Sequence, residues 1–176
     1  MKQIAALAMI LALAAPPANA TEIDDFSGDP AARWGFFTDQ VMGGVSTGQT
    51  RFSGGALRLT GDVSTANNGG FIQARLRLAE RMPEGARAVV LRVRGNGARY
   101  YVHLRTGGTM LPWHYYQAPF ETSADWTEVR LPFSAFVPST RMVRRSPDPA
   151  SVRSIAVVAY GADYRADLSV DWIGYE

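Results

Sequence analysis

The chain has 176 residues, of which 47% are hydrophobic and 19% are charged, and its formal net charge is +2. This length fits one domain with its own core, and the absence of cysteine excludes disulfides, iron–sulfur clusters and thiolate zinc sites. Carboxylates are interspersed with the basic residues along the chain, and this balance argues against a nucleic-acid-binding protein.

The first twenty residues are typical of a secretory signal peptide. Lys2 gives a positive start, residues 4–15 form an uncharged apolar run, and Ala18-Asn19-Ala20 is the small-x-small pattern that signal peptidase recognises. The apolar run is too short to span a bilayer. We therefore expect cleavage after Ala20, and a soluble domain at residues 21–176 that has no transmembrane segment and is periplasmic or secreted.

The rest of the chain has the period-2 alternation of β-strands. The pattern predicts strands at residues 70–78, 89–94, 100–105, 129–133 and 168–172, and a strand buried on both faces at 155–160. In the last alternating strand we expect Leu168, Val170 and Trp172 to face the core. Glycine-rich turns separate the strands, and no segment of three turns has a helical period. We predict an all-β fold, a single jelly-roll β-sandwich.

The polar residues of the alternating strands are expected to share the outer face of the sandwich. They are Gln73, Arg75, Arg77, Arg92, Arg94, Tyr101, His103 and Arg105, and Trp113, Tyr115 and Tyr116 follow them. Arginine and aromatic side chains can stack on planar groups and grip carboxylate or phosphate, so this face is a candidate binding surface. A solvated outer face explains the alternation equally well. On either interpretation, replacing Arg75, Arg94 and Arg105 by alanine should leave the stability nearly unchanged.

A glycine-rich loop is the second candidate binding site. Its candidate residues are Asp39, Met42, Gly43, Gly44 and Ser46. Adjacent glycines allow positive φ, and Asp39 and Ser46 can bond the free backbone N–H groups of such a turn. The loop is either a structural crossing held by packing of Trp34 and Met42 or a loop that contacts a ligand.

The segment Gly44-Val45-Ser46-Thr47-Gly48 satisfies the G-x-S-x-G pattern of hydrolases, but that motif needs a helix directly after the serine. Residues 50–59 instead predict a hairpin around Ser53-Gly54-Gly55. His103 and His114 lack the ligand spacing of a zinc site. We expect no catalytic residues, no enzyme activity and no cofactor.

Three carboxylates are weak candidates for a calcium site. Asp24 and Asp25 lie near the mature N-terminus and Asp171 near the C-terminus, and the terminal strands of jelly rolls often run side by side. Oxygen ligands from such a cluster suit calcium. Solvated surface carboxylates are the alternative.

Several motifs occur in an order that resembles the complex I intermediate-associated protein family. They are Trp34, Thr38-Asp39-Gln40-Val41-Met42-Gly43-Gly44-Val45-Ser46, Asn67-Asn68-Gly69-Gly70-Phe71, Arg92-Val93-Arg94-Gly95-Asn96-Gly97 and Leu168-Ser169-Val170-Asp171-Trp172-Ile173. The resemblance implies a galactose-binding-like jelly roll and a role in assembly. We therefore expect a non-catalytic module that binds a protein partner in assembly or chaperone-like fashion. The alternative is a carbohydrate-binding module whose partner is a saccharide.

Overall fold

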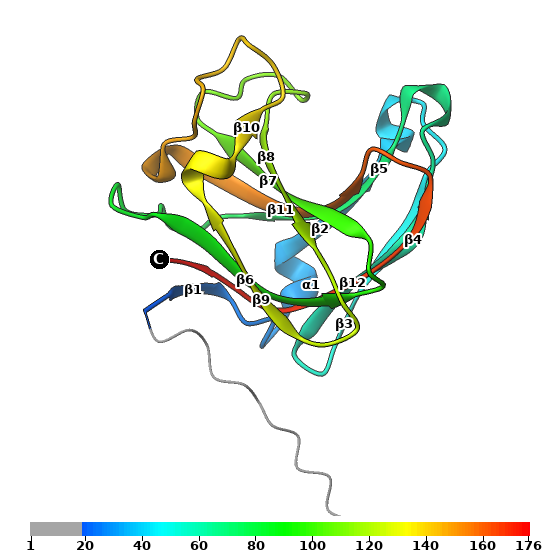
Figure 1. Ribbon diagram of the computed structural model, residues 1–176, viewed down its shortest axis with the longest axis horizontal. Helices are drawn as coiled ribbons and strands as arrows, with labels where there is room; N and C mark the ends of the chain where they lie inside the picture. The colour runs from blue at the N-terminus through cyan, green and yellow to red at the C-terminus, as the bar shows by residue number, and fades with distance from the viewer. Residues whose placement is uncertain (1–18) are drawn as a thin grey trace, which may run out of the picture.

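The computed structural model describes residues 19–176. Residues 1–18, which make up most of the expected signal peptide, lie outside this range. Within the described range, no helix combines the length and hydrophobicity that a membrane span requires. Two antiparallel six-stranded sheets pack face to face, as predicted for a jelly-roll sandwich (Figure 1). All the strands of both sheets lie between Thr21 and Tyr175.

The strand order defines the two sheets. Sheet A has the order β3-β4-β12-β6-β9, with β1 added beside β12. Its strands are β1 (Thr21–Asp24), β3 (Thr47–Ser53), β4 (Ala56–Val63), β6 (Ala88–Gly95), β9 (Thr127–Pro132) and β12 (Tyr164–Tyr175). Sheet B has the order β10-β8-β7-β11-β5-β2. Its strands are β2 (Trp34–Thr38), β5 (Phe71–Arg77), β7 (Arg99–Thr106), β8 (Tyr116–Glu121), β10 (Val137–Pro138) and β11 (Val152–Tyr160).

Between positions 19 and 176, helical structure is confined to short turns between strands. These are α1 (Pro30–Arg33) and the 3-10 turns η1 (Asp39–Met42), η2 (Ala66–Asn68), η3 (Phe133–Ala135) and η4 (Pro149–Ser151). The predicted hairpin at residues 50–59 joins β3 to β4, and Gly54 and Gly55 take the positive φ values of 58° and 71° that its turn requires.

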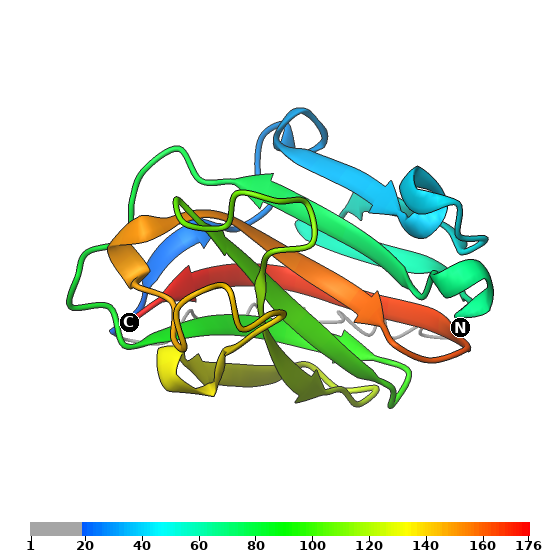
Figure 2. The same ribbon diagram turned by 90° about the horizontal axis from the view of Figure 1, so that it is seen from above.

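The core lies between the sheets and is built by the alternating residues of the predicted strands. Ile72, Ala74 and Leu76 of β5 are buried in it, as are Val102 and Leu104 of β7. Strand β11 lies in the middle of sheet B between β5 and β7 (Figure 2), which confirms the central position predicted for residues 155–160.

One inward-facing residue was predicted wrongly. Leu168 and Val170 enter the core, but the pairing of β12 with β6 shifts between Val170 and Trp172. A β-bulge at this point exchanges the two faces, so Ile173 takes the core position instead of Trp172. The Trp172 indole instead donates a hydrogen bond of 3.2 Å to Glu22 of β1.

Candidate ligand-binding cleft

The outer face of sheet B carries a cleft of about 690 Å³. Its floor follows from the strand register, because Ala156 of β11 pairs with Arg75 of β5 on one side and with His103 of β7 on the other. Ser154 precedes Ala156 on the same face of β11 and also lines the cleft. Small side chains on the middle strand between long ones on its neighbours leave a hollow in the sheet surface.

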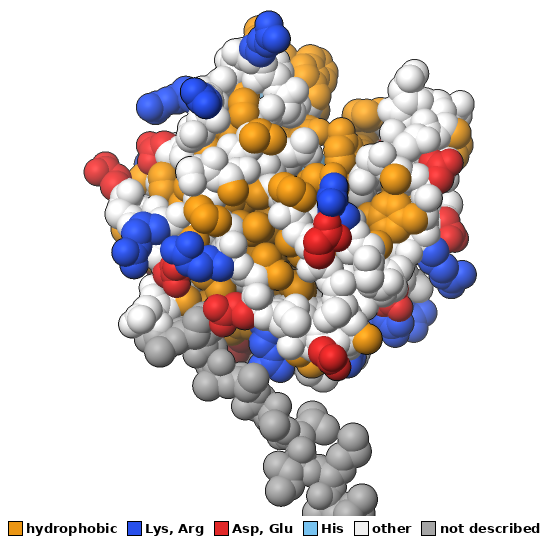
Figure 3. Space-filling view, in the orientation of Figure 1, with side chains coloured by type: hydrophobic (Ala, Val, Ile, Leu, Met, Phe, Trp, Pro, Cys, Tyr) orange, Lys and Arg blue, Asp and Glu red, His pale blue; other side chains and the backbone are white. Residues whose placement is uncertain are grey.

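Two loops that are distant in sequence form the walls of the cleft. Val41 and Met42 of η1 stand on one side, where 72% and 61% of their surfaces are exposed. Pro112 and Trp113 stand on the other side, in the segment between β7 and β8, and Trp113 is 60% exposed. Figure 3 shows a notch between two projections of the surface, with hydrophobic side chains along its sides.

The wall at η1 is held by Asp39, which is completely buried. Its carboxylate accepts hydrogen bonds from the Ser46 N–H (2.9 Å), the Ser46 hydroxyl (2.5 Å), the Gly70 N–H (2.6 Å) and the Phe71 N–H (3.3 Å). A side chain at Gly44 would place its Cβ 2.3 Å from Asp39. Burial raises the pKa of Asp39, but these hydrogen bonds outweigh burial and hold the pKa below its usual value.

Most of the glycine-rich loop is therefore structural. The Asp39 carboxylate, by bonding Ser46 and the Gly70 N–H, joins the Gly43-Gly44 motif to the Gly69-Gly70 motif. Gly43 supplies a left-handed turn with φ of 88°. The Ser46 hydroxyl also accepts a hydrogen bond from the Ser64 N–H, and a strand follows it, as predicted from the hydrolase-like pattern. Of the two alternatives for Met42, packing in a structural crossing does not hold, because Met42 is largely exposed and lines the cleft, where the alternative of a ligand contact places it. Trp34 is buried in the core, as expected.

Arg105 holds the opposite wall in place. Its guanidinium donates hydrogen bonds to the carbonyls of Thr109 (3.2 Å), Leu111 (2.8 Å) and Pro112 (3.1 Å). Burial lowers the pKa of Arg105 from its ordinary value. The side chain thus positions the loop that presents Trp113 to the cleft.

Arg75 differs from Arg105 because its guanidinium donates no hydrogen bond to a loop of the described residues. Its guanidinium stacks over the Phe37 ring at 4.3 Å, and no hydrogen bond or ion pair joins it to another residue within 19–176. Burial, and then the neighbouring charges of Arg105 and Arg77, lower the pKa of Arg75 from its ordinary value. The lining of the cleft contains no carboxylate that would neutralise it.

An aromatic cluster closes one end of the cleft. His103 stacks on Tyr115 with ring centroids 4.3 Å apart, and the Tyr115 hydroxyl lies 3.5 Å from that of Tyr160. Tyr101 meets Tyr160 edge-on at 5.6 Å. Burial lowers the pKa of His103 to about 3, so this imidazole is neutral at ordinary pH.

The sequence grouped Arg94 with these residues, and the structure separates it from them. Arg94 lies on β6 of sheet A, where its guanidinium stacks 4.9 Å from the centre of the Trp126 ring. Arg92 of the same strand forms an ion pair with Asp171. The prediction that Arg94 shares a face with Arg75 and Arg105 is therefore wrong. Tyr116, also grouped there, is buried in the core.

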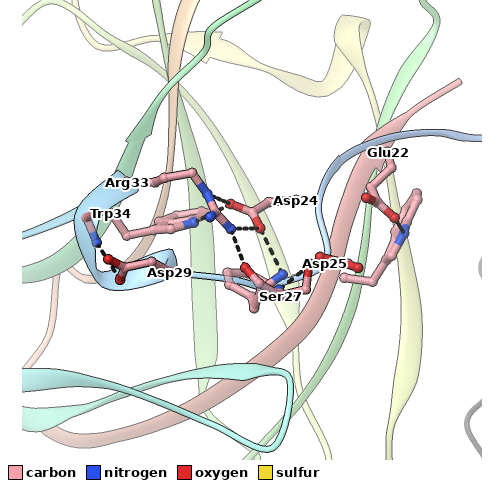
Figure 4. Close-up of polar contacts among 10 residues, drawn as sticks. Glu22, Asp24, Asp25, Ser27, Asp29, Arg33 and Trp34 are labelled. Atoms are coloured by element: carbon pink, nitrogen blue, oxygen red, sulfur yellow. Dashed lines mark hydrogen bonds and ion pairs between the residues drawn. The ribbon is translucent and has the colours of Figure 1, made fainter.

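The calcium candidates do not come together as a ligand set. The Asp24 carboxylate accepts hydrogen bonds from Arg33 and from the Trp34 indole at 2.9 Å, as Figure 4 shows. Asp25 caps its own turn by accepting from the Ser27 N–H, and Asp171 pairs with Arg92. Strands β1 and β12 do run side by side. Within residues 19–176, no three His, Asp or Glu side chains are placed to share a metal ion.

Comparison with known families decides the relationship. A profile of the family described as complex I intermediate-associated protein 30 matches residues 24–167. The chain belongs to this family. The match confirms the resemblance read from the sequence motifs, and it spans both walls of the cleft. A search of curated proteins finds no match.

Several carbohydrate-binding modules and agarases of solved structure share the fold of this family member. A family 11 carbohydrate-binding module of Clostridium thermocellum superposes with a TM-score of 0.68 and 15% identity, covering 91% of this chain and 95% of its own. The same module in complex with a β-1,3-1,4-mixed-linked tetrasaccharide gives 0.66 and 16%, covering 89% and 94%. The agarase AgWH50C gives 0.62 and 7%, covering 89% of this chain and 24% of the agarase.

Sequence reasoning did not single out several residues that line the cleft, among them Phe37, Val41 and Tyr160. Tyr160 could have been found, because it has the same parity along β11 as Ser154 and Ala156. Two small residues at alternate positions of a central strand are the signal for a hollow in its outer face. No local pattern indicates Phe37 and Val41, because the pairing of β2 with β5 is what places β2 and the following η1 beside the cleft.

Proposed function

We propose that the protein is a non-catalytic module that holds a segment of a protein partner in the cleft of sheet B, in assembly or chaperone-like fashion. The observation that carries this proposal is the exposed apolar rim of the cleft, formed by Val41 and Met42 on one wall and Trp113 on the other. Apolar surface of this kind, gathered around a hollow, marks interaction sites. Flexible methionine adapts to varied apolar partners.

The chemistry of the lining supports binding without catalysis. It holds two arginines, one neutral histidine and several aromatic rings, but no Asp or Glu. Such a set provides stacking and hydrogen bonding and lacks an acid–base pair. Membership in a family named for complex I assembly supports a partner of the assembly type.

A saccharide is the second candidate ligand, and Trp113 with Tyr115 favours it because aromatic rings stack on sugar rings. The structurally similar module that was solved with a tetrasaccharide supports this candidate as well. We rank it second because the two loops that form the walls expose four apolar side chains, which suits an apolar peptide better than a sugar. They are Val41, Met42, Met110 and Leu111.

The signal-peptide pattern at residues 1–20 supports export, so we propose that the partner is also exported or faces the periplasm. Complex I itself is then one candidate partner among membrane and periplasmic assemblies.

The test compares two tryptophans, one in the cleft and one outside it. Immobilised wild type, Trp113→Ala and Trp126→Ala proteins are exposed to the exported fraction of the producing cells and to mixed-linkage β-glucan. We expect the wild type and Trp126→Ala to retain the same protein, and Trp113→Ala to bind it about thirtyfold more weakly, as for an aromatic anchor. Retention of the glucan alone, lost in Trp113→Ala, would favour the saccharide.

A further inference from the structure

The cleft has an uncompensated positive charge on its floor. Five arginines elsewhere pair with acidic residues: Arg33 with Asp24, Arg58 with Asp167, Arg92 with Asp171, Arg99 with Glu121 and Arg130 with Glu176. Arg75 is half-buried and has no such pair among residues 19–176. Removing a cation from water without a counter-ion costs free energy, so this placement is unusual for a purely structural arginine.

The arrangement around Arg75 keeps its hydrogen-bonding capacity free. The contact with Phe37 engages the flat face of the guanidinium at 4.3 Å, and none of its N–H groups donates to another described residue. A guanidinium presents these donors in a planar fork that matches a carboxylate in bidentate fashion. Stacking on Phe37 fixes the plane of the fork before any ligand arrives.

The second arginine of the cleft strengthens the positive potential without competing for the ligand. Arg105 uses its donors on the carbonyls of the loop at 109–112, and its positive charge, together with burial, lowers the pKa of the nearby Arg75. His103 is neutral and the lining has no carboxylate, so nothing in the cleft offsets the two charges.

We propose that the cleft selects an acidic segment of its partner, in which an Asp or Glu carboxylate pairs with Arg75 while flanking apolar side chains contact Met42 and Trp113. This inference rests on the proposed protein-binding function and names the chemistry of the segment. The walls stand on both sides of Arg75, so the expected motif has apolar residues before and after the acid.

The test uses a phage-displayed library of random dodecapeptides, selected on wild type, Arg75→Gln and Arg51→Gln proteins. Arg51 is an exposed arginine on β3 of sheet A and serves as the matched control. We expect wild type and Arg51→Gln to enrich peptides that carry Asp or Glu beside apolar residues, and Arg75→Gln to lose the acidic preference while still binding apolar peptides.

A double-mutant cycle then measures the pair. For a selected synthetic peptide, changing its Glu to Gln should weaken binding to the wild type about tenfold or more, and should change binding to Arg75→Gln less than about twofold. Arg75→Lys should recover part of the affinity, because it keeps the charge and loses the fork.

The outcomes separate this inference from the proposed function. Peptides that bind without any acidic preference, or a preference that persists in Arg75→Gln, overturn the role of Arg75 and leave protein binding standing. Failure to enrich any peptide, together with binding of polygalacturonate or β-glucan, overturns both.

Discussion

Asp39 connects the two glycine motifs of the chain through a single buried carboxylate. It accepts four hydrogen bonds, of which two come from the Gly70 and Phe71 backbone at the start of β5. We predict that Asp39→Asn lowers the free energy of unfolding by about 2–3 kcal/mol at pH 7, since buried donors lose a charged acceptor. Urea unfolding measures this, and Gln49→Ala on the exposed face of β3 serves as a control that should change little.

The same contact predicts a dependence on pH. The pKa of Asp39 in the folded state lies below the ordinary value of 3.8, so its contribution is complete above about pH 4 and is lost as the pH falls through the lower folded pKa. The unfolding free energy of the wild type should therefore fall more steeply below pH 4 than that of Asp39→Asn. Parallel acid curves for the two proteins would show that Asp39 contributes nothing through its charge.

Arg75 and Arg105 lie on neighbouring rows of one face but are expected to respond differently to replacement. Arg105→Ala removes three hydrogen bonds to loop carbonyls, so we predict a loss of about 1–3 kcal/mol and faster amide exchange at residues 107–115. Arg75→Ala should stay within about 1 kcal/mol of wild type. Equal destabilisation of the two variants would contradict these separate roles.

The difference corrects an expectation from the sequence. Alternation along a strand indicates which side chains face outwards, and it placed Arg75, His103 and Arg105 correctly. Alternation cannot show that Arg105 donates its hydrogen bonds to the loop before β8, or that Arg94 lies on the other sheet, because both depend on the tertiary fold. The triple replacement of Arg75, Arg94 and Arg105 is therefore not a neutral probe of one surface.

At the scale of elements, strand periodicity and glycine turns predicted the sandwich and its longer strands, but they did not predict strands β1, β2, β8 and β10. The bulge in β12 was not predictable, because an inserted residue leaves the apolar composition of the strand unchanged while it exchanges the faces after Val170. The cleft was predicted only in part. Its floor follows from parity on three strands, whereas its walls come from loops whose positions the sequence does not encode locally.

The small residues of β11 provide a test of the cleft as an element of the sheet. Ser154→Leu places a larger side chain on the floor without deleting any contact named here, so we predict at least tenfold weaker binding of the ligand. Ser154→Ala is the matched control and should bind like the wild type. Unchanged binding by Ser154→Leu would place the ligand elsewhere.

For the whole molecule, the position of β1 fits the proposed cleavage site. Strand β1 begins at Thr21, which pairs with Tyr175 of β12, so a chain cut after Ala20 keeps every strand of the sandwich. We predict that the exported protein begins at Thr21. N-terminal sequencing of the protein from the periplasm or medium measures this, and a chain that retains Met1 would contradict export by a cleaved signal.

The molecule has two broad outer faces, and we propose that the one on sheet B binds the partner. Photo-cross-linking in the producing cells tests it most directly, with benzoylphenylalanine in place of Trp113 on sheet B or of Trp126 on sheet A. We predict that the residue at position 113 cross-links to a segment of an exported protein that mass spectrometry identifies as acidic and apolar, and that the residue at position 126 does not. Cross-links from position 126 alone, or a saccharide adduct at position 113 with no protein, would contradict the claim.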